Sequence, residues 1–257
     1  MEPFASYLLK SAVWLTGFSL IYFLFLRNER FFRIKRVYLI TGILASFIFP
    51  LISFHYKVEM PAPQAAISDL NLSAIPNDPA YESIPLTTTP DYRYALLFLY
   101  ITGVTLLSFR TLRQLRTLSG IIRKAGVTSR GPAKIVRAEG IPSSFSFFNY
   151  VFISPSVKEP ESEQMLNHEE VHVSQKHWFD LLLAELLQTV QWANPFAWIY
   201  TGFIKQNHEY HADEGALERT SNPANYRATL INQIFNAPVI CLSNSFSYSI
   251  NKKRFDM

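Results

Sequence analysis

The sequence predicts a mainly α-helical membrane protein, with three transmembrane helices followed by an α+β domain that contains a small β-sheet. Charged residues make up only 17% of the 257 residues, whereas a soluble domain has about a quarter. Three long apolar runs come first, and short aromatic stretches and long helical patterns follow. We therefore divide the chain into a transmembrane hairpin (1–55), an extracytoplasmic loop (56–93), a third transmembrane helix with a basic juxtamembrane helix (94–130), and a C-terminal domain (131–257).

The three apolar runs are Ser11–Leu26, Val37–Phe54 and Tyr94–Phe109. Each is close to the ~20 residues that an α-helix needs to cross a bilayer. Buried helices of a soluble core are the alternative, but three such uncharged runs are unusual in one soluble domain. The first run also differs from a secretory signal, because it lacks a small-residue cleavage site and a second run follows at once.

The charges of the short loops predict the orientation. The segment 27–36, "RNERFFRIKR", carries five basic residues and one Glu, and further basic residues follow the third run between 110 and 124. Because basic loops remain in the cytoplasm, we expect the amino terminus outside and everything after Phe109 inside. The segment 56–93 is rich in Pro, Ser and Thr and predicts an irregular external loop. The basic helix 110–130 is placed to contact anionic lipid headgroups.

The C-terminal domain begins with strand patterns. Lys134–Ala138 and Phe145–Ile153 are short and rich in aromatic and β-branched residues, and 140–142 predicts a turn between them. From Glu159 the pattern is helical almost to residue 237. Asn194-Pro195 and 221–223 each interrupt it.

The motif "LNHEEVH" contains a candidate metal site. In a helix His168 and His172 lie on one face and can bind one ion, with Glu169 beside them as a general base. The single cysteine, Cys241, leaves only His and carboxylate side chains as ligands and excludes an internal disulfide. Two surface histidines at this spacing by chance are the alternative.

A tetrahedral catalytic zinc needs a third protein ligand, and "NHEYHADEGAL" offers one downstream. We favour Glu209 as this ligand, with Asp213, one turn later, orienting a ligand histidine. His208 and His211 remain competing ligands. A histidine six residues after His172 would be another, but that position is Trp178. A polar helix with clustered histidines is the plain alternative.

The segment Trp178–Tyr200 is long and apolar enough to resemble a fourth span. If it crossed the membrane, His172 and Glu209 would lie on opposite sides and could not share an ion. It also contains five polar residues, namely Asp180, Glu185, Gln188, Gln191 and Asn194. We therefore expect an amphipathic helix that is buried in the domain or lies on the inner leaflet, with Asn194-Pro195 turning the chain back.

Four motifs occur in a fixed order: "SFSFFNYVFIS", "LNHEEVH", "NPFAW" and "EYHADE". With the paired spans and basic loop they resemble the BlaR/MecR-type antirepressor metallopeptidases. The resemblance implies a zincin-like (gluzincin) domain in the cytoplasm of a bacterium, anchored in its inner membrane. It further implies one zinc per chain, held by His168, His172 and Glu209, with Glu169 as general base. Members of this family cleave themselves or a transcriptional repressor after an external signal.

The chain departs from the best-known members of that family, which have a fourth span and an extracellular penicillin-binding domain. Its ending, "INKKRFDM", resembles a juxtamembrane basic stretch and would suit a fragment of a longer protein. Ser249 and Lys252 match S-x-x-K but lack a surrounding domain. The input signal is therefore left open, and β-lactam sensing is not assumed.

The expected partners are membrane lipid and a protein substrate, without direct nucleic-acid binding, and a homodimer is one option for assembly. Phe145–Ile153 is a candidate edge strand, where Phe147 and Asn149 would contact an extended substrate, although its Phe residues could equally form core. Tyr210 and His211 are weak candidates for stabilising the oxyanion. The rival functions are a housekeeping zinc protease for membrane-protein quality control and a non-catalytic zinc-bound signalling scaffold, which would have no need of Glu169.

Overall fold

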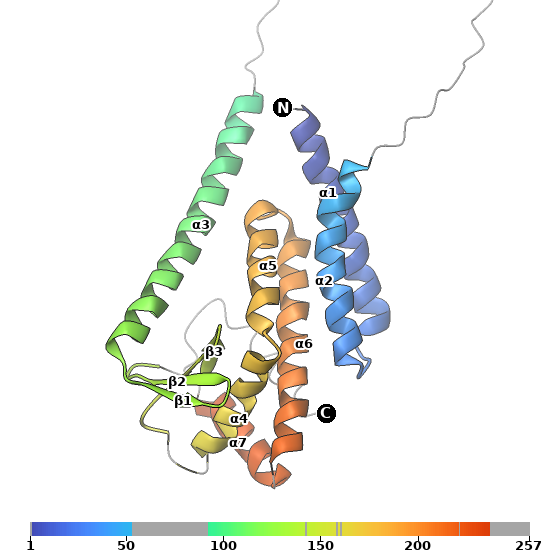
Figure 1. The fold of residues 1–257 in the computed structure, drawn as a ribbon. Coiled ribbons are helices and arrows are strands. Elements are labelled where there is room, and N and C mark those ends of the chain that lie inside the picture. Colours follow the sequence, from blue (N-terminus) through green and yellow to red (C-terminus); the bar gives the residue numbers. More distant parts are fainter. Residues whose placement is uncertain are drawn as a thin grey trace, which may run out of the picture.

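The computed structural model describes residues 2–52, 92–141, 143–157, 159, 161–220 and 222–236. Cys241, the Ser249–Lys252 pair and nearly all of the loop 56–93 lie outside these ranges. The helices are α1 (Glu2–Ile21), α2 (Phe32–Ile48), α3 (Tyr92–Lys124), α4 (Glu161–Ser174), α5 (His177–Val190), α6 (Pro195–Arg219) and α7 (Pro223–Asn236), shown in Figure 1. The strands are β1 (Val127–Arg130), β2 (Ala133–Arg137), β3 (Phe145–Phe147) and β4 (Tyr150–Ile153).

Three helices of the described ranges are long and apolar enough to cross a membrane. A π-helical turn, Tyr22–Leu26, extends α1, and a 3₁₀ turn, Phe49–Leu51, extends α2. With 33 residues, α3 rises about 50 Å, well beyond the ~30 Å hydrocarbon core. The mostly helical class and the three predicted spans are confirmed, and the basic juxtamembrane segment continues the third span.

The small sheet has the order β1-β2-β4-β3, with β2 and β4 parallel and the other pairs antiparallel. Two details differ from the sequence prediction. The expected helix 110–130 ends at Lys124, and its last residues form β1. The expected strand Phe145–Ile153 is a hairpin, because Phe148 adopts a left-handed conformation (φ 51°) that turns β3 back along β4. The short strand β3 forms one edge of the sheet.

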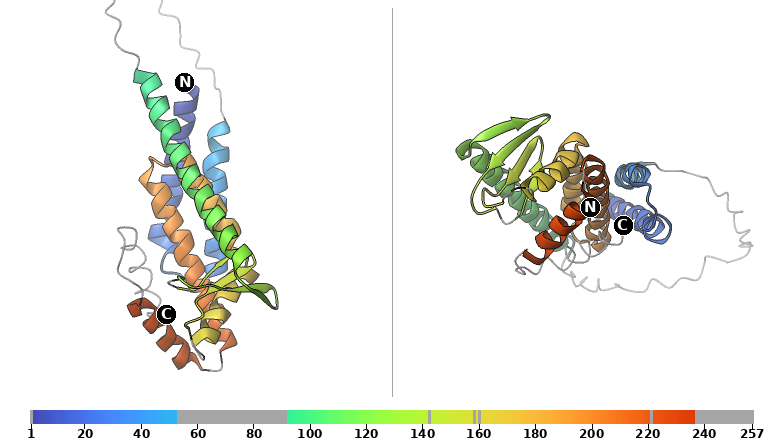
Figure 2. Two further views of the ribbon diagram at one scale, coloured as in Figure 1. Left: turned by 90° about the vertical axis from the view of Figure 1, so that its left-hand side faces the viewer. Right: turned by 90° about the horizontal axis from the view of Figure 1, so that it is seen from below.

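Helices α5 and α6 form a hairpin that rises between α3 on one side and the α1–α2 pair on the other, as Figures 1 and 2 show. Lys176 (φ 54°) separates α5 from α4, a break that the sequence did not predict. The Asn194 side chain caps α6 at the backbone N–H of Phe196, and Pro195 follows as its first residue. The turn predicted at Asn194-Pro195 is thus present, and it returns α6 to α4.

The tip of this hairpin lies at the level of residues well inside the spans. The Gln191 amide donates to Ser11 Oγ of α1 (2.6 Å), and the Tyr100 hydroxyl of α3 donates to the Val190 carbonyl (3.0 Å). A helix of 14 residues rises only about 21 Å, which is too short to cross. The hairpin therefore enters between the spans without crossing. Of the two expected placements, buried in the domain or on the inner leaflet, burial is the one that the buried residues of α5 support, and the spanning helices supply part of the cover.

Two of the polar residues of α5 that argued against a fourth span, Asp180 and Glu185, are paired with the spanning helices. Asp180 accepts from Arg36 of α2 (2.7 Å), and Glu185 accepts from the Thr111 hydroxyl of α3 (2.7 Å). Buried polar groups need such partners. Together with the shared apolar core of α1, α2, α5 and α6, they hold the hairpin in register with the spans.

Gly42 of α2 allows a close approach of a span to the hairpin. A Cβ at this position would overlap the hydroxyl of Tyr200, which is fully buried and donates to the Leu39 carbonyl (3.0 Å). We expect Gly42→Ala to destabilise the protein by about 1–3 kcal/mol, measured as a lower thermal midpoint in detergent. Gly17→Ala in α1, where a Cβ meets nothing within 4 Å, is the control and should leave the midpoint unchanged or raise it.

Candidate metal centre

Helices α4 and α6 bring three metal-binding side chains together. His168 and His172 lie one turn apart on α4, and their Nε2 atoms are 3.2 Å apart. Glu209 of α6 places one carboxylate oxygen 3.7 Å from Nε2 of His168 and the other 3.8 Å from Nε2 of His172. All the ligand atoms lie within 4.8 Å of one another. The predicted grouping of these three residues is thus present.

This arrangement fits a zinc ion. Bond lengths of about 2.0–2.2 Å in a tetrahedral site separate the ligand atoms by roughly 3.3–3.5 Å, close to the observed spacings. Two imidazoles and one carboxylate form a donor set of catalytic zinc sites, which keep a fourth position open. The chemistry and spacing of the donors therefore suit a catalytic zinc ion.

The packing of α4 against its neighbours fixes the two histidines. Apolar side chains of β2 and β4, including Ile135 and Val151, pack against Met165 and Leu166 on one side of α4. On its α6 side, a Cβ at Gly215 would come within 2.9 Å of a Val171 methyl group. The small residue lets α4 and α6 approach closely enough for Glu209 to reach the histidines.

His168 is held from behind by two groups. Its Nδ1 lies 2.9 Å from the Tyr226 hydroxyl and 3.1 Å from the Asp213 carboxylate, and the Tyr226 hydroxyl donates to the same carboxylate (2.7 Å). These partners keep the proton on Nδ1 and leave Nε2 to face Glu209 and His172. Asp213 thus lies where the sequence placed it, whereas Tyr226 on α7 was not predicted.

His172 has a different partner. Its Nδ1 lies 2.8 Å from Nδ1 of His177, the first residue of α5. Burial, together with the neighbouring His208 and His172, lowers the pKa of His177 far below its ordinary value, so this ring is neutral. A neutral ring can accept a hydrogen bond from His172, whose Nε2 is turned to the candidate metal position.

Glu169 is buried beside the ligand group. Burial raises its pKa above the ordinary carboxyl value. The electrostatic effect of the neighbouring His168 opposes this shift, Glu209 adds to it, and hydrogen bonds from Ser146 and Ser144 oppose it. A raised pKa suits a carboxylate that must both take up and release a proton. The two serines, which lie in and just before β3, are further site residues that no motif in the sequence indicated.

The other predicted candidates lie elsewhere. His208 forms a 2.8 Å contact with Asp180, and His211 lines a separate pocket with Arg33 and Glu214. Neither belongs to the ligand group found among the described residues.

The two predicted substrate contacts lie at the β3–β4 hairpin. Phe147 is half-buried in the edge strand, and Asn149 is exposed in the turn that follows it. Phe148, between them, packs its ring on Trp178 at the start of α5 (4.5 Å between centroids). The hairpin is therefore anchored next to the helix that carries His177.

Comparison with known proteins agrees with this site. A protein-family model described as BlaR1 peptidase M56 matches residues 36–257. The match includes most of α2, the sheet and all three members of the candidate ligand group. A search of curated proteins gives no match. The match confirms the resemblance suggested by the four motifs and gives the chain a function of membrane metallopeptidase type: it belongs to the BlaR1 peptidase M56 family.

Proposed function

We propose that this chain is a zinc metalloendopeptidase of a bacterial inner membrane, in which His168, His172 and Glu209 bind the ion and Glu169 is the general base. The observation that carries the proposal is the convergence of the three ligand atoms within 4.8 Å, next to a buried carboxylate whose pKa is raised by burial. A surface cluster of histidines, the plain alternative, would need no such carboxylate at its side.

The reaction assigned to the site is hydrolysis of a peptide bond. Zinc bound here would polarise the scissile carbonyl and make water more acidic. Glu169 takes the proton from the attacking water and later gives it to the leaving amine. Ser144 and Ser146 orient its carboxylate. Asp213 and Tyr226 orient His168, so that the ligand geometry is set before a substrate arrives.

The edge strand β3 is the proposed substrate site. Among the described residues its outer edge pairs with no further strand, so an extended peptide can pair with it, as in other β-augmentation complexes. The Ser146 side chain of β3 forms a hydrogen bond with Glu169. A peptide paired with this strand would therefore lie next to the general base. Phe147 and Asn149 are proposed to contact the substrate from this hairpin.

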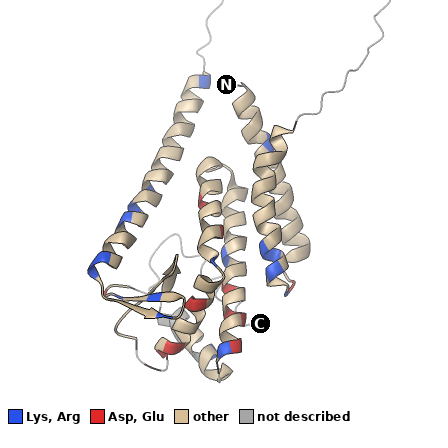
Figure 3. Ribbon diagram, viewed as in Figure 1, with Lys and Arg blue, Asp and Glu red and all other residues tan. Residues whose placement is uncertain are grey.

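The charges of the membrane helices support a cytoplasmic site. Basic residues gather at the ends of α2 and α3 nearest the sheet and α4 (Figure 3). Under the positive-inside rule this end faces the cytoplasm. A protease domain at this end of the spans, in contact with them, is suited to transmit a signal received at the membrane by cleaving itself or a transcriptional repressor. We propose this signalling role in place of membrane-protein quality control.

Removal and return of the metal tests the enzymatic proposal. The full chain is reconstituted in liposomes with bacterial cytosolic protein, and new amino termini are identified by mass spectrometry. We expect cleavage products, including products of the chain itself, that vanish with 1,10-phenanthroline and return with zinc in slight excess. Products that persist after zinc is stripped would contradict a zinc peptidase, and liposomes without the protein are the control.

A further inference from the structure

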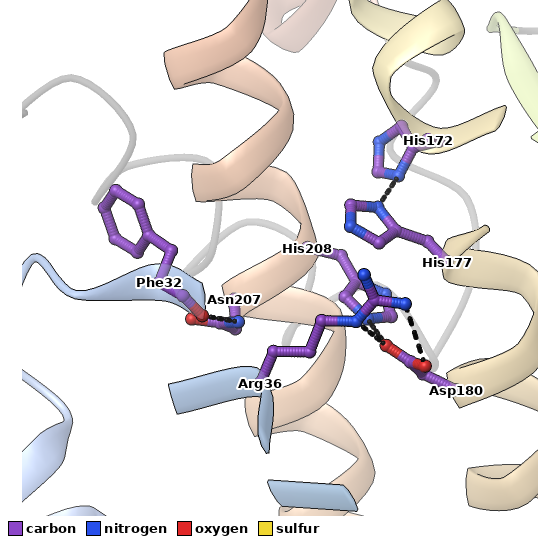
Figure 4. Close-up of polar contacts among 7 residues, drawn as sticks. All are labelled: Phe32, Arg36, His172, His177, Asp180, Asn207 and His208. Atoms are coloured by element: carbon purple, nitrogen blue, oxygen red, sulfur yellow. Dashed lines mark hydrogen bonds and ion pairs between the residues drawn. The ribbon is translucent and has the colours of Figure 1, made fainter. Parts of the chain in front are cut away.

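A buried polar cluster connects the cytoplasmic end of α2 with the candidate metal site (Figure 4). It consists of Arg36 of α2, His177 and Asp180 of α5, and His208 of α6. The side chains of Asp180 and His208 are only 1% and 4% exposed. None of the four belongs to the ligand group, so their burial needs another reason.

The cluster begins at the ligand His172. Nε2 of His172 faces Glu209 and His168, so Nε2 is the nitrogen that would bind an ion. In a neutral imidazole whose Nε2 binds an ion, the proton lies on Nδ1. Nδ1 therefore donates to Nδ1 of His177, 2.8 Å away. The partner behind a metal-binding histidine fixes its ring orientation and its basicity. His177 is thus the hydrogen-bond partner of His172, as Asp213 and Tyr226 are the partners of His168.

The next link is a ring stack. His177 and His208 lie parallel, with an interplanar angle of 2° and centroids 4.1 Å apart. Nε2 of His208 in turn donates to Asp180 Oδ2 (2.8 Å). The carboxylate thus fixes the plane of His208, and the stack transmits that orientation to His177. Because a stack carries no hydrogen bond, this connection sets position and does not conduct protons.

The last link reaches the membrane-spanning helix. Arg36 binds the Asp180 carboxylate through two nitrogens, Nε at 2.7 Å and Nη2 at 3.1 Å. One turn earlier on α2, the Phe32 carbonyl accepts from the Asn207 amide (3.0 Å), next to His208 in the sequence. The two-pronged geometry leaves little freedom in the distance between α2 and α5.

We propose that His177 is a positioning residue for the metal ligand His172, and that Arg36 of α2 holds His177 in place through Asp180 and His208. A displacement of α2 relative to the α5–α6 hairpin would then change the affinity and geometry of the metal site. This inference rests on the proposed zinc site and adds to it a route by which the membrane helices regulate the peptidase.

Two substitutions of His177 separate positioning from simple packing. His177→Phe keeps a ring for the stack but removes the acceptor, whereas His177→Asn keeps an acceptor but loses the ring. We expect His177→Phe to weaken Co²⁺ binding by the full-length protein in nanodiscs roughly 10- to 100-fold, with a changed visible spectrum of the bound ion. His177→Asn should lose less affinity than His177→Phe because the acceptor remains, but it should stay below the wild type because the stack with His208 is lost. A merely structural residue would give the opposite order.

The link to α2 is tested by combining variants. Arg36→Met should weaken Co²⁺ binding several-fold, and His177→Phe should cost less in that background than in the wild type, because parts of one network are not additive. Arg33→Met, an exposed arginine one turn earlier on α2, is the control and should not alter binding. If Arg36→Met does not fold, Arg36→Lys, which keeps the charge but not the two-pronged contact, replaces it with the same expected coupling.

The outcomes separate this inference from the proposed function. Unchanged Co²⁺ affinity and spectrum in His177→Phe, while the wild type binds the ion, would overturn the positioning role alone. Fully additive losses in the double variant would overturn the link through Arg36. A wild-type protein that binds no Co²⁺ would overturn the metal site and this inference together.

Discussion

Replacing Glu169 by glutamine is expected to lower peptide hydrolysis about 10²- to 10⁴-fold, the usual contribution of a general base. Glutamine has the same shape and can still accept from Ser144 and Ser146, so the fold around it should persist. It cannot, however, take up a proton from water. The measurement is the rate of the zinc-dependent cleavage in liposomes, together with the zinc content of the purified variant by elemental analysis.

The matched control is Glu163→Gln on the same helix. Glu163 pairs with Arg130 at a half-exposed position, where an ion pair contributes little to stability, and it takes no part in the ligand group. Full activity is expected from this variant. Zinc-loaded Glu169→Gln that cleaves as fast as the wild type would rule out Glu169 as the general base. A wild-type protein that binds zinc but cleaves nothing would instead favour the non-catalytic scaffold.

Local patterns predicted the parts of the site that local geometry determines. His168 and His172 share a helix face because they are one turn apart, and no tertiary information is needed for that. Asp213 follows Glu209 by the same spacing. The sequence could not show that α6 approaches α4 closely enough for Glu209 to reach the histidines, which depends on contacts such as Gly215 against Val171.

The parts that the sequence missed depend on partners distant along the chain. Tyr226 meets His168 across 58 residues, and Asp180 meets Arg36 across 144. The apolar face of α5 indicated a covered surface but could not indicate what covers it. The sequence therefore left the domain and the inner leaflet as alternatives, whereas spanning helices cover part of this face. Two further misses, the α4–α5 break and the β3–β4 hairpin, come from Lys176 and Phe148 in left-handed conformations, which residues other than Gly seldom adopt.

Replacing Glu209 by glutamine is expected to remove zinc. The variant leaves only two protein ligands, and we expect its affinity to fall by more than about 100-fold, beyond the loss typical of a changed outer partner. Because an ion that binds only the native state stabilises it, by about 2.7 kcal/mol at 100 times its Kd, added zinc should raise the thermal midpoint of the wild type. That increase should vanish in Glu209→Gln. The measurements are the thermal midpoint with and without zinc and the zinc content after dialysis.

His211→Gln tests whether His211, rather than Glu209, is the third zinc ligand. His211 lies on the same helix as Glu209 and could bind zinc, but it lines a separate pocket with Arg33 and Glu214. The variant should therefore keep its zinc and its zinc-dependent rise in thermal midpoint. The reverse pattern, with zinc lost from His211→Gln and retained by Glu209→Gln, would make His211 the third ligand. It would also require α6 to rotate in the zinc-bound protein, since the carboxylate of Glu209 is the group that faces both histidines.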